Sequence, residues 1–190
     1  MKITMLLIVL FSTGLMYAQN FKGHVSGTYG SVNEKIRLQY EMPLDSQVSY
    51  GINMNYYFKG WKGPVAEPFI RLYRKKDGNS EGFYGQAKLI YGNLSPLDST
   101  FFGGEIVNER WSTYGVGLGC GNKFLFAKHF TIEYLAGARI LSPPPIIDDH
   151  YYFDQIGWYL STGFPIDFQL KVGFQFERNR MLLKLISRIW

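Results

Sequence analysis

The chain has a single cysteine, Cys120, and no apolar run long enough for a membrane-spanning helix. One cysteine excludes an internal disulfide framework, and a small apolar role fits it better than a nucleophilic one. The longest apolar stretch covers residues 3–16 and falls short of the ~20 residues that a spanning helix needs. The formal net charge of +5 is small and scattered along the chain, so we expect no nucleic acid as a partner.

Enzyme and cofactor motifs are also lacking. A hydrolase trio could be imagined from Ser112, His129 and Glu133, but their spacing fixes no geometry. The densest group of metal-ligand types is Asp148 to His150, with Asp154 nearby. It lacks the spacing and the glycine of a calcium loop, so we interpret it as a loop segment. We therefore expect no catalytic residue, no metal site and no cofactor.

The first 18 residues have the features of an export signal. Lys2 supplies a positive start, residues 5–11 form a short apolar segment, and Ala18 is a small residue suited to the cleavage site. The sequence thus predicts a signal peptide at residues 1–18, cleaved after Ala18.

Beyond residue 20 the dominant pattern is an alternation of apolar and polar residues with a period of two, which indicates β-strands. Residues 47–58 and 168–176 show it most clearly. The pattern predicts strands at residues 21–30, 34–42, 47–58, 65–75, 82–92, 111–126, 129–140 and 167–176. Two further strands, at 154–164 and 180–190, would make ten. We favour eight because the alternation stays regular up to Phe176 and fails after it.

The two faces of these strands differ in composition. One face is rich in aromatic and aliphatic side chains, whereas the other carries glycine and scattered charges. Glycine suits a crowded interior in which long charged side chains need room, and the lumen of an eight-stranded barrel is just wide enough for side chains to fill. Charges there must be paired. The predicted lumen network consists of Lys35, Arg37, Glu41, Glu67, Arg71, Lys88, Glu133, Arg139 and Lys171.

Aromatic residues gather near the predicted strand ends, as in transmembrane barrels with two aromatic girdles. The first predicted girdle contains Tyr73, Phe83, Tyr84, Phe124, Phe126, Phe130, Phe174 and Phe176. The second contains Tyr56, Phe58, Trp61, Tyr91, Trp111 and Tyr114. Long connections are predicted at residues 59–64, 93–110 and 141–166, and they alternate with short turns. If the first strand runs outward, all of the long connections lie at the outer end of the barrel.

Several segments resemble the small outer-membrane β-barrels of the OmpA/OmpX-like type, many of them uncharacterised. The resemblance is carried by loose patches that together cover most of the chain after residue 18. They are Gln39 to Leu44 leading into 48–58, Arg71 to Tyr73 with Glu81 to Tyr84, Tyr114 to Gly119 with Lys128 to Glu133, and Val172 to Phe176. The chain departs from the pattern in its basic extension after Phe176.

Alternation and resemblance imply an all-β, antiparallel, up-and-down transmembrane barrel at residues 19–176 and an extension or last strand at 177–190. The implied role is that of a non-enzymatic integral protein in the outer membrane of a Gram-negative bacterium, with a side-chain-filled lumen. The implied partners are outer-membrane lipid, lipopolysaccharide and the barrel-insertion machinery. A soluble periplasmic ligand-binding barrel and a lipid-modifying enzyme remain alternatives. Candidates for loop contacts are Trp61, Phe101, Phe102, Trp111, Asp148, Asp149 and His150.

Overall fold

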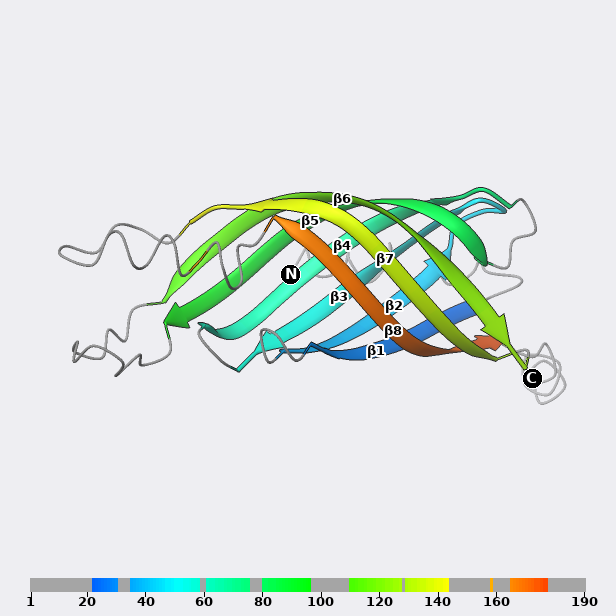
Figure 1. Cartoon of the computed structure of the whole chain (residues 1–190), viewed down its shortest axis with the longest axis horizontal. Coiled ribbons are helices and arrows are strands. Elements are labelled where there is room, and N and C mark those ends of the chain that lie inside the picture. Colours follow the sequence, from blue (N-terminus) through cyan, green and yellow to red (C-terminus); the bar gives the residue numbers. More distant parts are fainter. Residues whose placement is uncertain are drawn as a thin grey trace, which may run out of the picture.

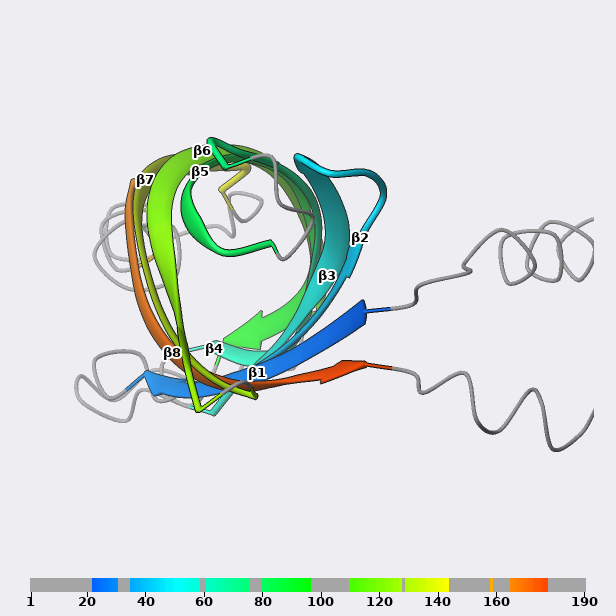
Figure 2. The ribbon, with the colours of Figure 1, turned by 90° about the vertical axis from the view of Figure 1, so that its right-hand side faces the viewer.

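The computed structural model describes residues 22–30, 35–58, 61–75, 80–96, 110–127, 129–143, 158 and 165–177. They form one closed antiparallel barrel in which each strand pairs with its neighbours in the chain and β8 pairs with β1 (Figures 1 and 2). The strands are β1 (Lys22–Gly30), β2 (Lys35–Pro43), β3 (Val48–Tyr57), β4 (Trp61–Tyr73), β5 (Gly82–Pro96), β6 (Trp111–Phe126), β7 (Phe130–Leu141) and β8 (Ile166–Glu177). The predicted eight-stranded, all-β barrel is therefore confirmed. No helix among the described residues is long and apolar enough to span a membrane.

Some sequence predictions fall outside the described residues. These are the signal peptide at 1–18, the extension from 178 onward, and all of the possible extra strand at 154–164 except Trp158.

Two predicted boundaries are wrong, because β4 already begins at Trp61 and β5 continues to Pro96. The connection after β3 is consequently short, and only residues 97–110 and 142–165 form long connections. Both join an odd-numbered strand to the next one, so both lie at one end of the barrel, here called the loop end. The opposite end, with the β2–β3, β4–β5 and β6–β7 connections, is the turn end.

A side chain organises the turn between β2 and β3. The Asp45 carboxylate accepts hydrogen bonds from the backbone N–H of Gln47 at 2.7 Å and of Val48 at 2.8 Å. An aspartate that bonds the backbone two residues on mimics a backbone turn, which is why the residue suits this position. The two donors hold the pKa of Asp45 below its ordinary value because they favour the charged carboxylate.

The barrel turns its apolar face outward. Leu170 and Phe174 are 57% and 44% exposed, whereas Arg37 and Lys171 are each 1% exposed. Along all eight strands, Lys62 is the only charged residue among the described outward positions. A soluble barrel shows the reverse arrangement, with an apolar core and charges in water. The predicted orientation is therefore the one that the structure has.

Glycines on β6 make room for the interior side chains of β5. A Cβ atom at Gly117 would lie 2.8 Å from Cε of Lys88, and one at Gly121 would lie 2.6 Å from the hydroxyl oxygen of Tyr84. Both distances are shorter than real contacts allow. The glycine-rich face predicted for this strand thus has a steric origin.

Aromatic residues lie on the outer surface near both ends of the barrel, as predicted, with three corrections. Outward rings at the turn end belong to Phe83, Phe124, Phe126, Phe130 and Phe174, and those at the loop end to Tyr56, Phe58, Tyr91 and Tyr114. Tyr73 and Tyr84 instead point into the barrel, where they are at most 1% exposed. Trp111 is half-buried and packs against Trp158, with ring centroids 5.7 Å apart. The alternation along each strand decides where a side chain points. For Tyr73, Tyr84 and Trp111 it outweighs the preference of aromatic rings for a membrane interface.

Because the apolar face points outward, a charge introduced at the middle of the wall should destabilise the barrel more than one introduced in a turn. Leu89 lies at the middle of β5 and is 64% exposed, while Leu44 lies in the β2–β3 turn and is 67% exposed. In lipid vesicles, Leu89→Arg is expected to lower the free energy of unfolding by about 2–4 kcal/mol, because its charge would lie at the bilayer midplane. Leu44→Arg is the matched control and should change it by less than about 0.5 kcal/mol. Urea titration of the refolded barrel measures both, and equal effects would show that Leu89 does not face hydrocarbon.

Candidate functional site

The interior of the barrel is layered along its axis, and β4 passes through every layer. Its inward residues, from the loop end to the turn end, are Val65, Glu67, Phe69, Arg71 and Tyr73, all 5% exposed or less. Inward positions on the other strands follow the same order. The result is an apolar layer near each mouth and two charged networks between them.

Arg71 is the centre of the charged network nearer the turn end, here called the lower network. Its Nη1 lies 2.6 Å from Glu41, and its Nη2 lies 2.8 Å from Glu133. Its Nε donates to the Gln86 side chain at 2.8 Å, and Nη2 also donates to the Gln39 side chain at 3.1 Å. A guanidinium offers five donors in a fixed fork, and these bonds together with a second contact from Nη1 to Glu133 at 3.0 Å use all of them.

Both carboxylates of the lower network bind further donors. Lys123 and Tyr73 donate to Glu41, each at 2.7 Å. Lys171 and Tyr84 donate to Glu133 at 2.8 Å and 2.9 Å. The two carboxylates and their donors come from six strands, so the network joins opposite walls of the barrel through its interior.

The network nearer the loop end, the upper network, is built on Glu67 and Asp167. Lys88 bridges the two carboxylates, with its Nζ 2.8 Å from Glu67 and 2.6 Å from Asp167. Arg37 and Arg139 approach the other oxygen of Glu67 less closely, at 3.5 Å and 3.9 Å. These two contacts are longer than those that Arg71 makes in the lower network.

An apolar layer lies above the upper network at the loop end. It contains Tyr57, Val65, Ile90, Leu94, Leu141 and Trp158, with Trp111 packed against it. Trp158 belongs to the connection between β7 and β8 and is completely buried. A smaller apolar cluster, of Tyr73, Tyr84 and Leu135, lies in the half of the barrel nearer the turn end. Apolar side chains thus border the charged networks on both sides.

The structure places the nine predicted lumen residues on the inner face. Eight of them are at most 6% exposed, and Lys35 is half-buried with its Nζ 3.3 Å from the Tyr57 hydroxyl. The prediction missed Lys123, Asp167 and His24. The alternating pattern could have identified two of them. Lys123 falls on the same face as the inward glycines of β6, and Asp167 falls on the same face as Lys171. His24 lies in a glycine-rich segment whose alternation is weak. In the structure its Nε2 lies 2.6 Å from the Thr131 hydroxyl oxygen, and its Nδ1 lies 3.7 Å from Glu41.

The predicted loop contacts are not brought together among the described residues. Trp61 lies in β4 opposite Pro96, and Trp111 lies in β6 opposite Leu94, so neither belongs to a loop. Phe101, Phe102, Asp148, Asp149 and His150 fall outside the described residues.

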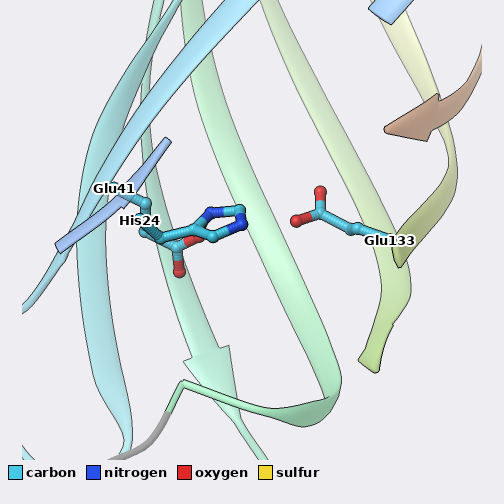
Figure 3. A group of neighbouring side chains, drawn as sticks. All are labelled: His24, Glu41 and Glu133. Atoms are coloured by element: carbon cyan, nitrogen blue, oxygen red, sulfur yellow. The ribbon is translucent and has the colours of Figure 1, made fainter. Parts of the chain in front are cut away.

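One cluster has ligand atoms close enough for a metal ion. His24 and Glu41 face each other across the β1–β2 pair, and Glu133 approaches them from β7 (Figure 3). Their ligand atoms all lie within 4.8 Å of one another. However, Arg71, Lys123 and Lys171 already bind the two carboxylates and would repel a cation. The donor set therefore fits a hydrogen-bonded interior better than a metal centre.

The imagined hydrolase trio is not assembled. Ser112 lies at the loop end of β6, whereas His129 lies in the turn after that strand. The His129 ring stacks on Phe174 with centroids 5.3 Å apart, and its Nδ1 lies 3.1 Å from the Gln175 carbonyl oxygen. Glu133 is bound by Arg71 and Lys171 inside the barrel. No proton relay connects these three residues.

Comparisons with known proteins identify an architecture. No protein-family model matches the chain, and no curated protein sequence matches it. Among solved structures, the N-terminal β-barrel domain of Pseudomonas aeruginosa OprF is similar, with a TM-score of 0.51. The likeness covers 83% of this chain and 97% of that domain at 14% sequence identity. It supports the barrel fold that the OmpA/OmpX-like resemblance implies.

The lower network predicts a strong coupling between Glu133 and Lys171. Glu133→Gln is expected to lower the free energy of unfolding by about 3–5 kcal/mol, because it leaves buried cations without their partner. Adding Lys171→Gln should cost less than the two single changes combined, by about 1 kcal/mol or more. Glu81→Gln, in a partly exposed pair with Lys75, is the control and should stay within about 0.5 kcal/mol. Additive effects in this double-mutant cycle would argue against a functioning ion pair.

Proposed function

We propose that this chain is an integral protein of the outer membrane of a Gram-negative bacterium, with a structural or surface-binding role rather than an enzymatic one. The observation that carries the proposal is the orientation of the barrel wall. Apart from Lys62, its described outward strand positions carry no charge and most of them are apolar, whereas the other described charged side chains of the strands lie inside. Only a hydrocarbon surrounding makes this arrangement favourable, because exposed apolar surface is unfavourable in water and unpaired charge is unfavourable in lipid.

The dimensions of the wall fit a bilayer. A transmembrane strand needs about 9–11 residues when tilted, and the strands here have 9 to 16. Because the sheet is closed, its backbone donors and acceptors are paired without water. The outward aromatic residues near both ends match the positions of the two membrane interfaces.

The interior favours a closed barrel over a wide pore. Eight strands leave a lumen that side chains can fill, and here two charged networks and two apolar layers occupy it. Arg71 bridges carboxylates on β2 and β7. A lumen filled by side chains agrees with a role as a scaffold or as a binding surface at the loop end.

The partners follow from the location. Lipid tails cover the wall, and lipopolysaccharide is the lipid expected near the loop end, where Lys62 is exposed. We propose that the regular alternation of β8 up to Phe176 is read by the barrel-insertion machinery during assembly. The aromatic and acidic residues of the long connections, including Phe101, Phe102 and Asp148 to His150, remain candidates for contacts with a ligand of unknown identity.

Two alternatives predict different results. A soluble periplasmic ligand-binding barrel needs an apolar cavity and a polar exterior, and neither agrees with the observed orientation. A lipid-modifying enzyme predicts a change in lipid A. Mass spectrometry of lipid A from cells with and without the protein distinguishes this alternative, because our proposal predicts identical spectra.

We expect the folded chain to behave as a membrane barrel in fractionation. It should remain in the membrane pellet after salt and carbonate washes, because its attachment is apolar rather than electrostatic. After refolding in detergent, the unheated protein should migrate differently from the boiled protein on a gel. Extraction by carbonate, or stability without detergent, would contradict the proposal.

The filled interior predicts low conductance. In a planar lipid bilayer, the refolded chain should give no steady current steps comparable to those of a 16-stranded porin measured under the same conditions. The boiled protein serves as the control for leakage caused by detergent. Stable steps of porin size would show that the layers do not close the lumen, although the location would still stand.

A further inference from the structure

Few polar side chains lie on the outer face of the wall. Apart from tyrosine hydroxyls and the single cysteine, those at described strand positions belong to Lys62, Asn93, Ser95, Ser112 and Asn122. The first four lie within the last few residues of their strands at the loop end. Asn122 lies farther along β6, between the inward residues Gly121 and Lys123. Among the described residues, it is the one outward amide within the part of the wall that the proposed location places in hydrocarbon.

The Asn122 side chain makes no hydrogen bond to a described residue. It is half-buried, and its Oδ1 is buried without a donor. Its neighbours across the ladder are the aromatic residues Phe83 on β5 and Tyr134 on β7. An amide has two N–H donors and an oxygen that accepts hydrogen bonds, and hydrocarbon offers no water to satisfy them. The amide therefore needs a polar partner from outside the barrel.

The outer surface on the loop side of Asn122 is lined mostly by small residues. The six outward positions here, in two adjacent rows across β5, β6 and β7, are Gly85, Ala87, Leu118, Cys120, Ala136 and Ala138. A Cβ atom at Gly85 would meet no atom beyond its chain neighbours within 4 Å, so the surface is open there. Leu118 is 71% exposed and lies between two alanines. A hollow thus lies beside a protruding side chain, and such a surface can pack against a copy of itself.

Symmetry favours a second copy as the partner of the amide. Two copies in one membrane have the same orientation, so a two-fold axis that relates them runs along the membrane normal. Each residue at such a contact meets residues at its own depth, and Asn122 can meet the same amide of the other copy. Because an amide both donates and accepts, two identical amides satisfy each other. The described outward positions of β5, β6 and β7 carry no charge that would oppose the contact.

We propose that the outer face of β5, β6 and β7 binds a second copy of this chain, with Asn122 of one copy hydrogen-bonded to the partner's Asn122. The small residues let the two walls approach closely, and Leu118 packs against the hollow of the partner. A two-fold contact is closed, so the assembly is a dimer. The inference rests on the proposed membrane location, because water would satisfy the amide of a soluble barrel.

Cross-linking of the single cysteine tests the contact. The refolded full-length mature chain in phospholipid vesicles is treated with bismaleimidoethane, a short thiol cross-linker. Cys120 is exposed and lies beside Asn122 on the outer face of β6, so we expect a band of twice the monomer mass. The control combines Cys120→Ala with Leu38→Cys, which moves the thiol to the outer face of β2 across the barrel, and should give little of this band. Equal yields from the two positions, or no dimer from Cys120, would overturn the proposal.

Two matched variants test the amide. Asn122→Leu keeps a side chain of similar size without a hydrogen-bonding group. It should need about tenfold more protein per lipid for the same cross-linked fraction, as the loss of a hydrogen bond between polar groups in a bilayer implies. Asn93→Leu removes an outward amide at the loop end and should leave the cross-linked fraction unchanged. An unchanged fraction in Asn122→Leu would contradict the assignment.

The outcomes separate the dimer from the membrane location. A barrel that resists carbonate extraction and shows heat-modifiable mobility, but stays monomeric at every protein-to-lipid ratio, would overturn the dimer and leave the location intact. In that case, a lower free energy of unfolding for Asn122→Leu would assign the amide to a polar group of a lipid. A chain that carbonate extracts from the membrane would overturn both proposals.

Discussion

The structure depends on the pairing of charges inside a wall whose outer face is apolar. Because the outer face is apolar, the charged strand residues whose side chains the structure describes, apart from Lys62, lie in a narrow interior. A single buried ion is highly unfavourable there, and a cation between two carboxylates is not. Arg71 meets this requirement with two carboxylates and all of its donors used. Because its partners come from β2, β5 and β7, the same contacts that neutralise the charges also hold opposite walls at a fixed distance.

The period-two alternation predicts most of this fold because each strand has one environment on each side. It identifies eight strands, their order and the inward position of residues such as Arg37 and Lys171. It misplaces Tyr73 and Tyr84 because aromatic rings suit both a membrane interface and a barrel mouth, and only the phase of the strand decides between them. The alternation does not predict which inward side chains pair with each other. Lys123 meets Glu41 across 82 positions of sequence, and this separation depends on register and tilt rather than on local pattern.

The likeness to the OprF barrel domain at 14% identity follows from the same physics. Outward positions need only be apolar, so many residues satisfy them. Inward positions need pairs of opposite charge, but the acid and the base of a pair can exchange strands without altering the backbone. Two chains can therefore keep a barrel while sharing few residues, and similarity in the wall carries little information about what the connections at the loop end contact. Residue-specific function in such a barrel has to be sought where the constraint of balance is not met.

The two charged networks differ in this respect. The lower one has three cations on two carboxylates with short contacts, and its surplus charge is spread over many hydrogen bonds. In the upper one, Arg37 and Arg139 stand 3.5 Å and 3.9 Å from a single oxygen of Glu67, while Lys88 takes the shorter contacts. Arg139 also interacts with the Tyr57 hydroxyl, so the upper network extends into the apolar layer that contains Trp158. The charged interior is thereby joined to the end of the barrel with the long connections, where Trp158 of the β7–β8 connection is buried.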